Sequence, residues 1–383
     1  MLRFLTAGES HGRALVAIIE GLPAGLELNL ARINRLIKRR QGGYGRGQRM
    51  TIEEDRIEIF SGVRGSVTLG TPLTLVIYNR DWKNWQEIMA VGTEVQLEKR
   101  VVTSPRPGHA DLAGGLKYRQ KDLRNILERA SARETAVRVA VGAVAAELLS
   151  CFGIKLQGQV VAIGNVQACT EEKIVDSKLL SENPLYCLDQ EASLLMMKAI
   201  EEAKKRGDSL GGVVQVIAEG VPVGLGSHVQ WDRRLDGQLA QALMSIPAIK
   251  GVEIGKGFST AALFGSQVHD EIEYQEGQGF RHRTNQAGGI EGGISNGETL
   301  VLRAVMKPIP TLAQPLASVN WQTKEPSVAA VERADVCAVP AAAIVAEAVV
   351  AWVLAAALME KFGGDHLAET LLNYKSYVKQ IKK

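Results

Sequence analysis

The chain has 383 residues, of which 46% are hydrophobic, 23% charged and 5% aromatic, which excludes an intrinsically disordered protein. Its 45 Lys and Arg residues nearly balance its 42 Asp and Glu residues, so the net charge of +3 excludes a protein that binds polyanions over its whole surface. The four cysteines lack C-x-x-C spacing and the N-terminus has no signal-peptide pattern, so we expect a cytoplasmic protein with reduced thiols and no bound metal.

A short predicted strand at the N-terminus leads into the sequence G-E-S-H-G at residues 8–12, which is typical of a turn. This turn carries His11. Because a histidine can deliver a proton near neutral pH, His11 is a candidate acid–base residue, and a structural role is the alternative.

The next predicted element is an amphipathic helix over Leu30–Arg40, which runs into the glycine-rich loop G-G-Y-G-R-G at residues 42–47. All charged residues from 28 to 52 are basic. Arginine offers a planar fork to carboxylates and phosphates, and glycines let backbone amides approach the same ligand. We therefore predict that Arg40 and Arg46 bind an anion, and the alternative is a solvated basic helix face.

A stiff loop with the sequence P-R-P-G-H-A-D spans residues 105–111. It places His109 beside Arg106 and Asp111. His109 is therefore the second candidate for proton transfer.

Two long helices are predicted over Ala130–Leu149 and Pro340–Met359, and both are apolar around nearly the whole circumference, so they must be covered on several sides. Glu347 in the second helix favours burial in protein over burial in lipid. Three arginines lie at or just before the predicted helix starts, namely Arg129, Arg133 and Arg333. Cations are unfavourable there, which favours a bound anion over plain surface charge or a salt bridge. Asp335 could cap the second helix or face the same ligand.

Segments of the first half recur in the second half in the same order. E-G-L-P-A-G-L at residues 20–26 matches E-G-V-P-V-G-L at residues 219–225, and E-R-A-S at residues 128–131 matches E-R-A-D at residues 332–335. Strands are predicted over Leu73–Tyr78, Val213–Ala218 and Thr299–Met306. We predict one α+β domain over residues 1–383, in which a central layer of long helices lies between two antiparallel sheets. Two equivalent halves, about 1–200 and 201–383, would be related by pseudo-twofold symmetry.

Two glycine-rich stretches do not fit familiar nucleotide motifs. Residues 43–47 follow a helix instead of a strand, and residues 251–257 are one residue short of a Walker A loop, so neither Rossmann-type hydride transfer nor ATP hydrolysis is predicted. The stretches 288–297 and 307–311 could offer amides, a cation and a hydroxyl to a phosphate, and turns around a strand explain them equally well.

Taken together, these segments resemble the chorismate synthase family along essentially the whole chain. The most specific are G-E-S-H-G with E-G-L-P, then E-R-A-S-A-R-E-T at residues 128–135, and R-A-D at 333–335 followed by E-A-V at 347–349. The resemblance implies a lyase of the shikimate pathway that converts 5-enolpyruvylshikimate 3-phosphate to chorismate by anti-1,4-elimination of phosphate. It further implies a requirement for reduced FMN, with NADPH as a candidate reductant, and assembly as a homotetramer.

The resemblance also assigns roles to individual residues. His11 would protonate the leaving phosphate, His109 the reduced flavin, and Asp335 would assist proton removal from the substrate. Anionic substrate groups would be held by Ser10, Arg40, Arg46, Arg106, Arg133 and Arg333, and Arg40 and Arg46 also match NADP-binding positions. Flavin contacts would come from Arg129, Ala130, Ser131, Pro247, Ala248, Gly292, Lys307, Pro308, Ile309, Pro310, Thr311 and Arg333. Three residues depart from the commonest family pattern, namely Ala130, Pro247 and Ala334.

A second hypothesis is a module that binds RNA or another polyanion through the basic stretch Arg32–Arg49. Such a protein would use aromatic side chains for base stacking, and Tyr44 is the only aromatic residue in that stretch. This scarcity and the nearly balanced charge favour the enzyme hypothesis, in which neither nucleic acid nor a membrane is a partner.

Overall fold

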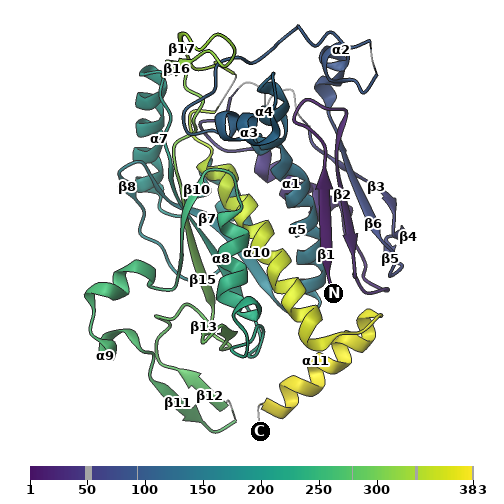
Figure 1. Ribbon diagram of the computed structural model, residues 1–383. Helices are drawn as coiled ribbons and strands as arrows, with labels where there is room; N and C mark the ends of the chain where they lie inside the picture. Colours follow the sequence, from purple (N-terminus) through teal and green to yellow (C-terminus); the bar gives the residue numbers. More distant parts are fainter. Residues whose placement is uncertain (48–53, 93, 278, 333–334, 382–383) are drawn as a thin grey trace.

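The computed structural model describes residues 1–383 apart from 48–53, 93, 278, 333–334 and 382–383. Two antiparallel sheets and two long helices form most of the core (Figure 1). The first sheet has the strand order β1-β2-β6-β3 and is built from β1 (Arg3–Ala7), β2 (Ala14–Glu20), β6 (Leu73–Tyr78) and β3 (Ile57–Ser61). Alternate residues of β2, such as Leu15, Ala17 and Ile19, are buried, as expected for a strand with one face on the core.

The second sheet has the order β10-β15-β9-β7-β8. Its strands are β10 (Ile249–Ile254), β15 (Leu300–Met306), β9 (Gly212–Glu219), β7 (Lys155–Ile163) and β8 (Val166–Gln167). The central strands are buried on both faces and therefore consist largely of continuous runs of β-branched and aliphatic residues. Three strands predicted from sequence, now β6, β9 and β15, are confirmed to within one residue at each end.

The two long helices are α5 (Thr135–Ser150) and α10 (Val339–Phe362). They contact each other, α5 packs on β2 and β6, and α10 packs on β7 and β9. Gly142 permits this close approach, because a Cβ added there would lie 2.3 Å from the carbonyl oxygen of Ala348. By length and composition α10 could cross a membrane, but 83% of its most apolar 18-residue window is buried inside the protein. It is therefore a core helix, as the sequence analysis favours.

The first long helix differs from its prediction. Ala130–Leu149 is not continuous, because α4 (Arg124–Ala130) ends before Ser131 and a short 3-10 turn precedes α5. Ser131 has extended backbone angles, φ −66° and ψ 140°, and its side chain accepts a hydrogen bond from the Arg133 amide. The hydroxyl thus caps a new turn, which the apolar pattern could not indicate.

The predicted amphipathic helix over Leu30–Arg40 is confirmed as α1 (Leu30–Gln41), and α8 (Leu235–Met244) packs on α10 and β10. The segment between β8 and β9, two strands of the second sheet, contains α6 (Ser177–Glu182) and α7 (Gln190–Lys205). The remaining helices are α2 (Gln86–Met89), α3 (Asp111–Tyr118), α9 (Gly265–Val268) and α11 (Leu367–Ile381).

Four small hairpins extend from this core. They are formed by β4 (Val63–Arg64) with β5 (Val67–Thr68), β11 (Ile272–Gln275) with β12 (Gly279–His282), β13 (Ile290–Glu291) with β14 (Ile294–Ser295), and β16 (Ala317–Val319) with β17 (Pro326–Val328). The loops after β1 and β15 meet α3 and α4 at one end of the molecule, whereas β13 lies toward the other end (Figure 1).

Candidate active site

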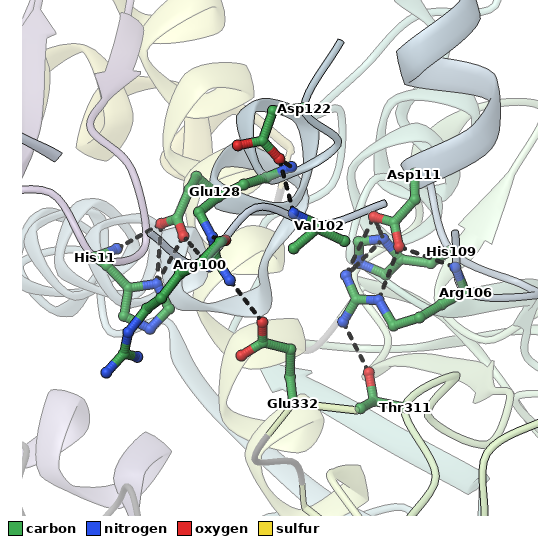
Figure 2. Close-up of polar contacts among 11 residues, drawn as sticks. His11, Arg100, Val102, Arg106, His109, Asp111, Asp122, Glu128, Thr311 and Glu332 are labelled. Carbon is green, nitrogen blue, oxygen red and sulfur yellow. Dashed lines mark hydrogen bonds and ion pairs between the residues drawn. The ribbon is translucent and has the colours of Figure 1, made fainter. Parts of the chain in front are cut away.

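His11 lies in the turn after β1 and is held by the last turn of α4. One carboxylate, that of Glu128, accepts a hydrogen bond from the His11 amide at 2.8 Å and contacts the ring Nδ1 at 2.8 Å (Figure 2). The backbone of Glu128 also accepts the Ser10 amide at 2.9 Å. Both histidine and carboxylate are buried, so the ring has a fixed position and direction.

The imidazole of His11 is stacked on Trp85, with ring centroids 3.7 Å apart and planes at 24°. The Trp85 indole N–H donates to Asp81 at 2.9 Å, which fixes the indole in turn. Arg100 and Arg124 lie over the same indole, at 4.3 Å and 5.3 Å from the ring centroid. The stack therefore sets the plane of the imidazole and places two cations near it.

Glu128 is ionised despite its burial. Burial alone raises the pKa of this carboxyl, but the hydrogen bonds and charge of His11, together with Arg124, outweigh it and hold the pKa below its usual value. Arg124 donates to Glu128 at 3.2 Å and to Glu332 at 2.9 Å (Figure 2). One buried guanidinium therefore links the His11 pair to the chain segment that ends in Asp335.

His109 has a similar partner in the loop before α3. Its Nδ1 lies 2.6 Å from a carboxylate oxygen of Asp111, the first residue of α3 (Figure 2). Arg106 donates to Asp111 at 2.8 Å and to the Thr311 hydroxyl at 2.8 Å. Burial raises the pKa of Asp111, but its hydrogen bonds to His109 and Arg106 are stronger in sum, so the pKa lies well below the usual range.

Hydrogen bonds of Asp122 and Val102 connect the chain segments that carry the two histidine clusters. The Val102 amide donates to Asp122 at 2.9 Å, and the Leu123 amide donates to the Val102 carbonyl at 3.1 Å. Asp122 also accepts the Arg124 amide at 2.9 Å. Figure 2 shows both clusters in one region, on either side of this connection.

Arg40 and Arg133, both predicted from sequence, share the buried carboxylate of Asp55. Arg133 forms two bonds to Asp55, at 2.5 and 2.7 Å, and Arg40 lies 3.9 Å from it. Arg40 also donates to the Thr135 hydroxyl at 2.9 Å. Asp55 was not predicted from the sequence, because nothing near it in the chain shows that it meets an arginine 78 positions away.

Asp335 is paired with the glycine-rich loop. Arg46 contacts one carboxylate oxygen at 2.6 Å, and the Gly47 amide donates to the other at 2.6 Å. Of the two roles left open by the sequence, capping of the second long helix is wrong, because the N-cap of α10 is Ala338.

Three predicted flavin residues, Arg129, Ala130 and Ser131, lie at the end of α4. Arg129 was expected near a helix start, but it occupies the last turn, where a cation interacts favourably with the helix dipole. It donates to the Gly8 carbonyl at 3.0 Å, and Ser131 donates to the Ser10 hydroxyl at 3.1 Å. These residues therefore surround the His11 turn.

A second group of predicted flavin residues lies next to the His109 loop. Lys307 donates from its amide to Ala248 at 2.9 Å, and from its ammonium group to the Gly108 carbonyl at 2.5 Å. This group consists of Pro247, Ala248, Lys307, Pro308, Ile309, Pro310 and Thr311. Gly292 is separate, since its hairpin precedes the start of β15 and Lys307 follows the end of that strand. The predicted residues Arg333 and Ala334 lie outside the described residues.

A groove of about 850 Å³ lies elsewhere on the molecule, between α5, α8 and α10. None of the predicted site residues lines it. The chemistry of the predicted site is therefore that of the two histidine clusters and their arginines.

Comparisons with known proteins point to one family. The family model described as chorismate synthase matches residues 2–359. Chorismate synthases from Moorella thermoacetica and Desulforamulus reducens are 65% and 59% identical to this chain, and each comparison covers 100% of both proteins. A solved structure, "Crystal Structure of Chorismate Synthase", superposes with a TM-score of 0.81 at 46% identity, over 100% of this chain and 98% of the other. The chain therefore belongs to the chorismate synthase family, the lyases that eliminate phosphate from 5-enolpyruvylshikimate 3-phosphate to give chorismate.

Proposed function

We propose that His11 and His109 are the proton donors of this elimination. The observation that carries the proposal is that each imidazole contacts a buried carboxylate through Nδ1, Glu128 for one and Asp111 for the other. Nε2 is then the nitrogen that can exchange a proton with a bound molecule. His11 protonates the departing phosphate, and His109 delivers a proton to the flavin.

The arginines supply the charge that this substrate requires. The substrate carries two carboxylates and a phosphate, and guanidinium forks bind such groups with two parallel hydrogen bonds. We propose that Arg40, Arg46, Arg106, Arg133 and Arg333 hold these groups, together with the Ser10 hydroxyl. The buried contacts of Arg40, Arg106 and Arg133 support the proposal, because they pre-orient the forks before the substrate arrives.

Reduced FMN fits the donor set near the two clusters. Arg129 and Lys307 bring cations, Ser131 and Thr311 bring hydroxyls, and the segments at Pro247 and Pro308 bring backbone groups. When bound, reduced FMN supplies a reduced ring system beside the substrate in a reaction that is redox-neutral overall. Asp335 assists proton removal from the substrate. Arg40 and Arg46 are the candidate contacts for NADPH, and we propose that the flavin is reduced by an outside donor.

The test is phosphate release under anaerobic conditions with reduced FMN and substrate, with and without NADPH. His11→Ala and His109→Ala are each expected to lower turnover by about 100-fold or more, the usual contribution of general acid–base catalysis. Wild-type turnover in both variants would contradict the two roles without touching the family assignment. A further reaction contains oxidised FMN and NADPH with no other reductant, and phosphate release in it would contradict reduction of the flavin by a separate donor.

We further propose that the fold is a layered duplication. Two observations support it: the strand order β1-β2-β6-β3 is matched by β7-β9-β15-β10, and α5 and α10 each pack on one of these sheets. In this correspondence the second half begins near β7, at about residue 155, instead of near 201, because β7 pairs with β9 as β1 pairs with β2.

The assembly that we propose is a cytoplasmic homotetramer that does not bind nucleic acid or membranes. The separate position of Gly292 supports an assembly in which neighbouring chains complete each other's sites. A flavin that contacts Lys307 of one chain would meet Gly292 of another copy.

A further inference from the structure

We propose that Glu128 is a positioning residue for His11, which fixes the imidazole so that Nδ1 donates to the carboxylate and Nε2 serves the reaction. The inference rests on the proposed role of His11 as proton donor. Glu128 itself is separated from the proton that His11 transfers by the width of the imidazole ring.

A single carboxylate holds His11 by two bonds of 2.8 Å, one to the backbone amide and one to the ring. A bond to the ring alone would allow the turn at residues 8–12 to move with respect to α4. Because both bonds converge on Glu128, the ring and its backbone are fixed together, and Trp85 removes the remaining rotation of the ring plane.

Glu128 keeps its charge although its side chain is only 2% exposed. Burial of an ionised carboxylate costs free energy, and a neutral amide could make the same hydrogen bonds to His11 if the contact were purely structural. Here the charge is retained, and Arg124 and His11 together lower the pKa of Glu128. The negative charge therefore lies beside Nδ1, on the side of the ring opposite the Nε2 that is proposed to serve the reaction.

The charged surroundings of His11 come from several elements. Glu128 and Arg124 lie on α4, Arg100 lies on the loop between α2 and α3, and Asp81 lies behind Trp85. Glu332 binds the far side of Arg124 at 2.9 Å. Among these described groups, Glu128 alone is in direct contact with the ring nitrogen, so its charge has the largest effect on the proton of His11.

Glu128→Gln tests the role of the carboxylate charge, because it keeps the size of the side chain and removes its charge. We expect kcat to fall at least about 10-fold, with KM for the substrate changed by less than about threefold, because Glu128 acts on the proton donor and not on the binding groups. In the pH–rate profile, the alkaline limb should move to lower pH, since loss of the anion makes the protonated imidazole less favourable. Glu128→Asp retains the charge and should keep the limb near its wild-type position while kcat falls.

Asp122→Asn is the matched control, two residues before α4. Asp122 accepts hydrogen bonds from the amides of Val102 and Arg124 and does not contact His11. We expect lower stability and an unchanged position of the alkaline limb.

Two outcomes would overturn the inference. One is a wild-type kcat and pH profile in a folded Glu128→Gln variant, and the other is a wild-type kcat in Glu128→Asp, which remains decisive if the glutamine variant does not fold. Wild-type turnover of His11→Ala is a different result, because it removes the proposed role of His11 itself.

Discussion

Asp55 is a buried anion that offsets the charges of two buried arginines, Arg133 and Arg40. Its carboxylate binds Arg133 in a fork-to-fork arrangement and lies 3.9 Å from Arg40. Asp55→Asn leaves two buried cations without this anion, and removal of one partner of a buried ion pair costs about 3–5 kcal/mol. We expect the free energy of unfolding, measured by urea titration, to fall by this amount, and KM for the substrate to rise.

Glu54 offers an adjacent control for Asp55. It forms an ion pair with Arg80, but the two side chains are 63% and 52% exposed. Exposed pairs contribute about 0–1 kcal/mol, so Glu54→Gln should leave the unfolding free energy nearly unchanged. Equal losses for the two variants would contradict the buried-counterion role of Asp55.

The lowered pKa of Asp111 leads to a prediction of how the stability of the fold depends on pH. Its pKa in the folded protein lies well below the unfolded value of about 3.9, because the hydrogen bonds of His109 and Arg106 overcome the effect of burial. A depressed pKa contributes stability above the unfolded value, and the contribution is lost as the pH falls toward the folded one.

The difference in unfolding free energy between the wild type and Asp111→Asn should therefore be constant above about pH 5 and shrink steadily below pH ~4. Urea titrations at pH 7, 5, 4 and 3 measure it. The same difference at all four values would show that the charge of Asp111 does not stabilise the fold.

Residues of the site that are neighbours in the chain were the ones that could be predicted. Arg106, His109 and Asp111 lie within six positions, so their contacts follow from one stiff loop. Glu128 instead meets His11 across 117 positions. A contact between residues so far apart in the chain depends on the packing of α4 against the turn after β1, and no local sequence pattern predicts it.

At the scale of elements, hydrophobic periodicity was sufficient for strands and long helices but not for their ends. The β-branched runs of β6 and β9 and the amphipathic pattern of α1 gave elements close to those observed. The break at Ser131 was missed, because residues that favour helices (Ala, Arg and Glu) continue on both sides and a single hydroxyl bond sets the boundary. Because of this boundary, Arg129 lies at the end of a helix and not at a helix start. A cation is favourable at a helix end, so its position there does not by itself indicate a bound anion.

The crossing of α5 and α10 leads to a prediction about Gly142. In an isolated helix, alanine is better than glycine by about 1 kcal/mol. At Gly142, however, the added Cβ would lie 2.3 Å from a backbone carbonyl that cannot rotate away. Overpacking of this kind costs about 1–3 kcal/mol or more, so the steric term exceeds the gain in helix propensity.

Gly142→Ala should therefore lower the midpoint of thermal unfolding. Gly92→Ala is the control, because a Cβ there meets no atom within 4 Å and the backbone needs no positive φ. An increase in the midpoint for Gly142→Ala would mean that the two helices can separate without loss.

At the scale of the whole molecule, the mixed fold followed from the sequence because two helices without a polar face require cover on several sides. The sequence did not predict which end of each sheet carries the candidate site, because this depends on where the loops after β1 and β15 meet. The family resemblance assigns both Gly292 and Lys307 to flavin contacts, without saying whether one chain supplies both. The seven residues of β15, about 3.3 Å each, separate the two positions.

A mixed assembly of two variant chains tests the proposal that Gly292 serves a neighbouring chain. Gly292 has φ +58° and no atom within 4 Å of an added Cβ, so Asp and Asn, which both tolerate this backbone conformation, can replace it without a clash. Gly292→Asp places an anion near the flavin and should weaken FMN binding, and Gly292→Asn is the uncharged control. His11→Ala inactivates the other component.

If each site takes His11 from one chain and Gly292 from another, equal co-expression of Gly292→Asp and His11→Ala chains restores about a quarter of the sites. A site is then intact when its own chain carries His11 and the neighbouring chain carries Gly292, and random assembly gives each condition half of the time. If both residues serve the same chain, every site contains one defect and no activity returns. The specific activity of the mixture, compared with the two separate variants under reduced FMN, distinguishes these arrangements.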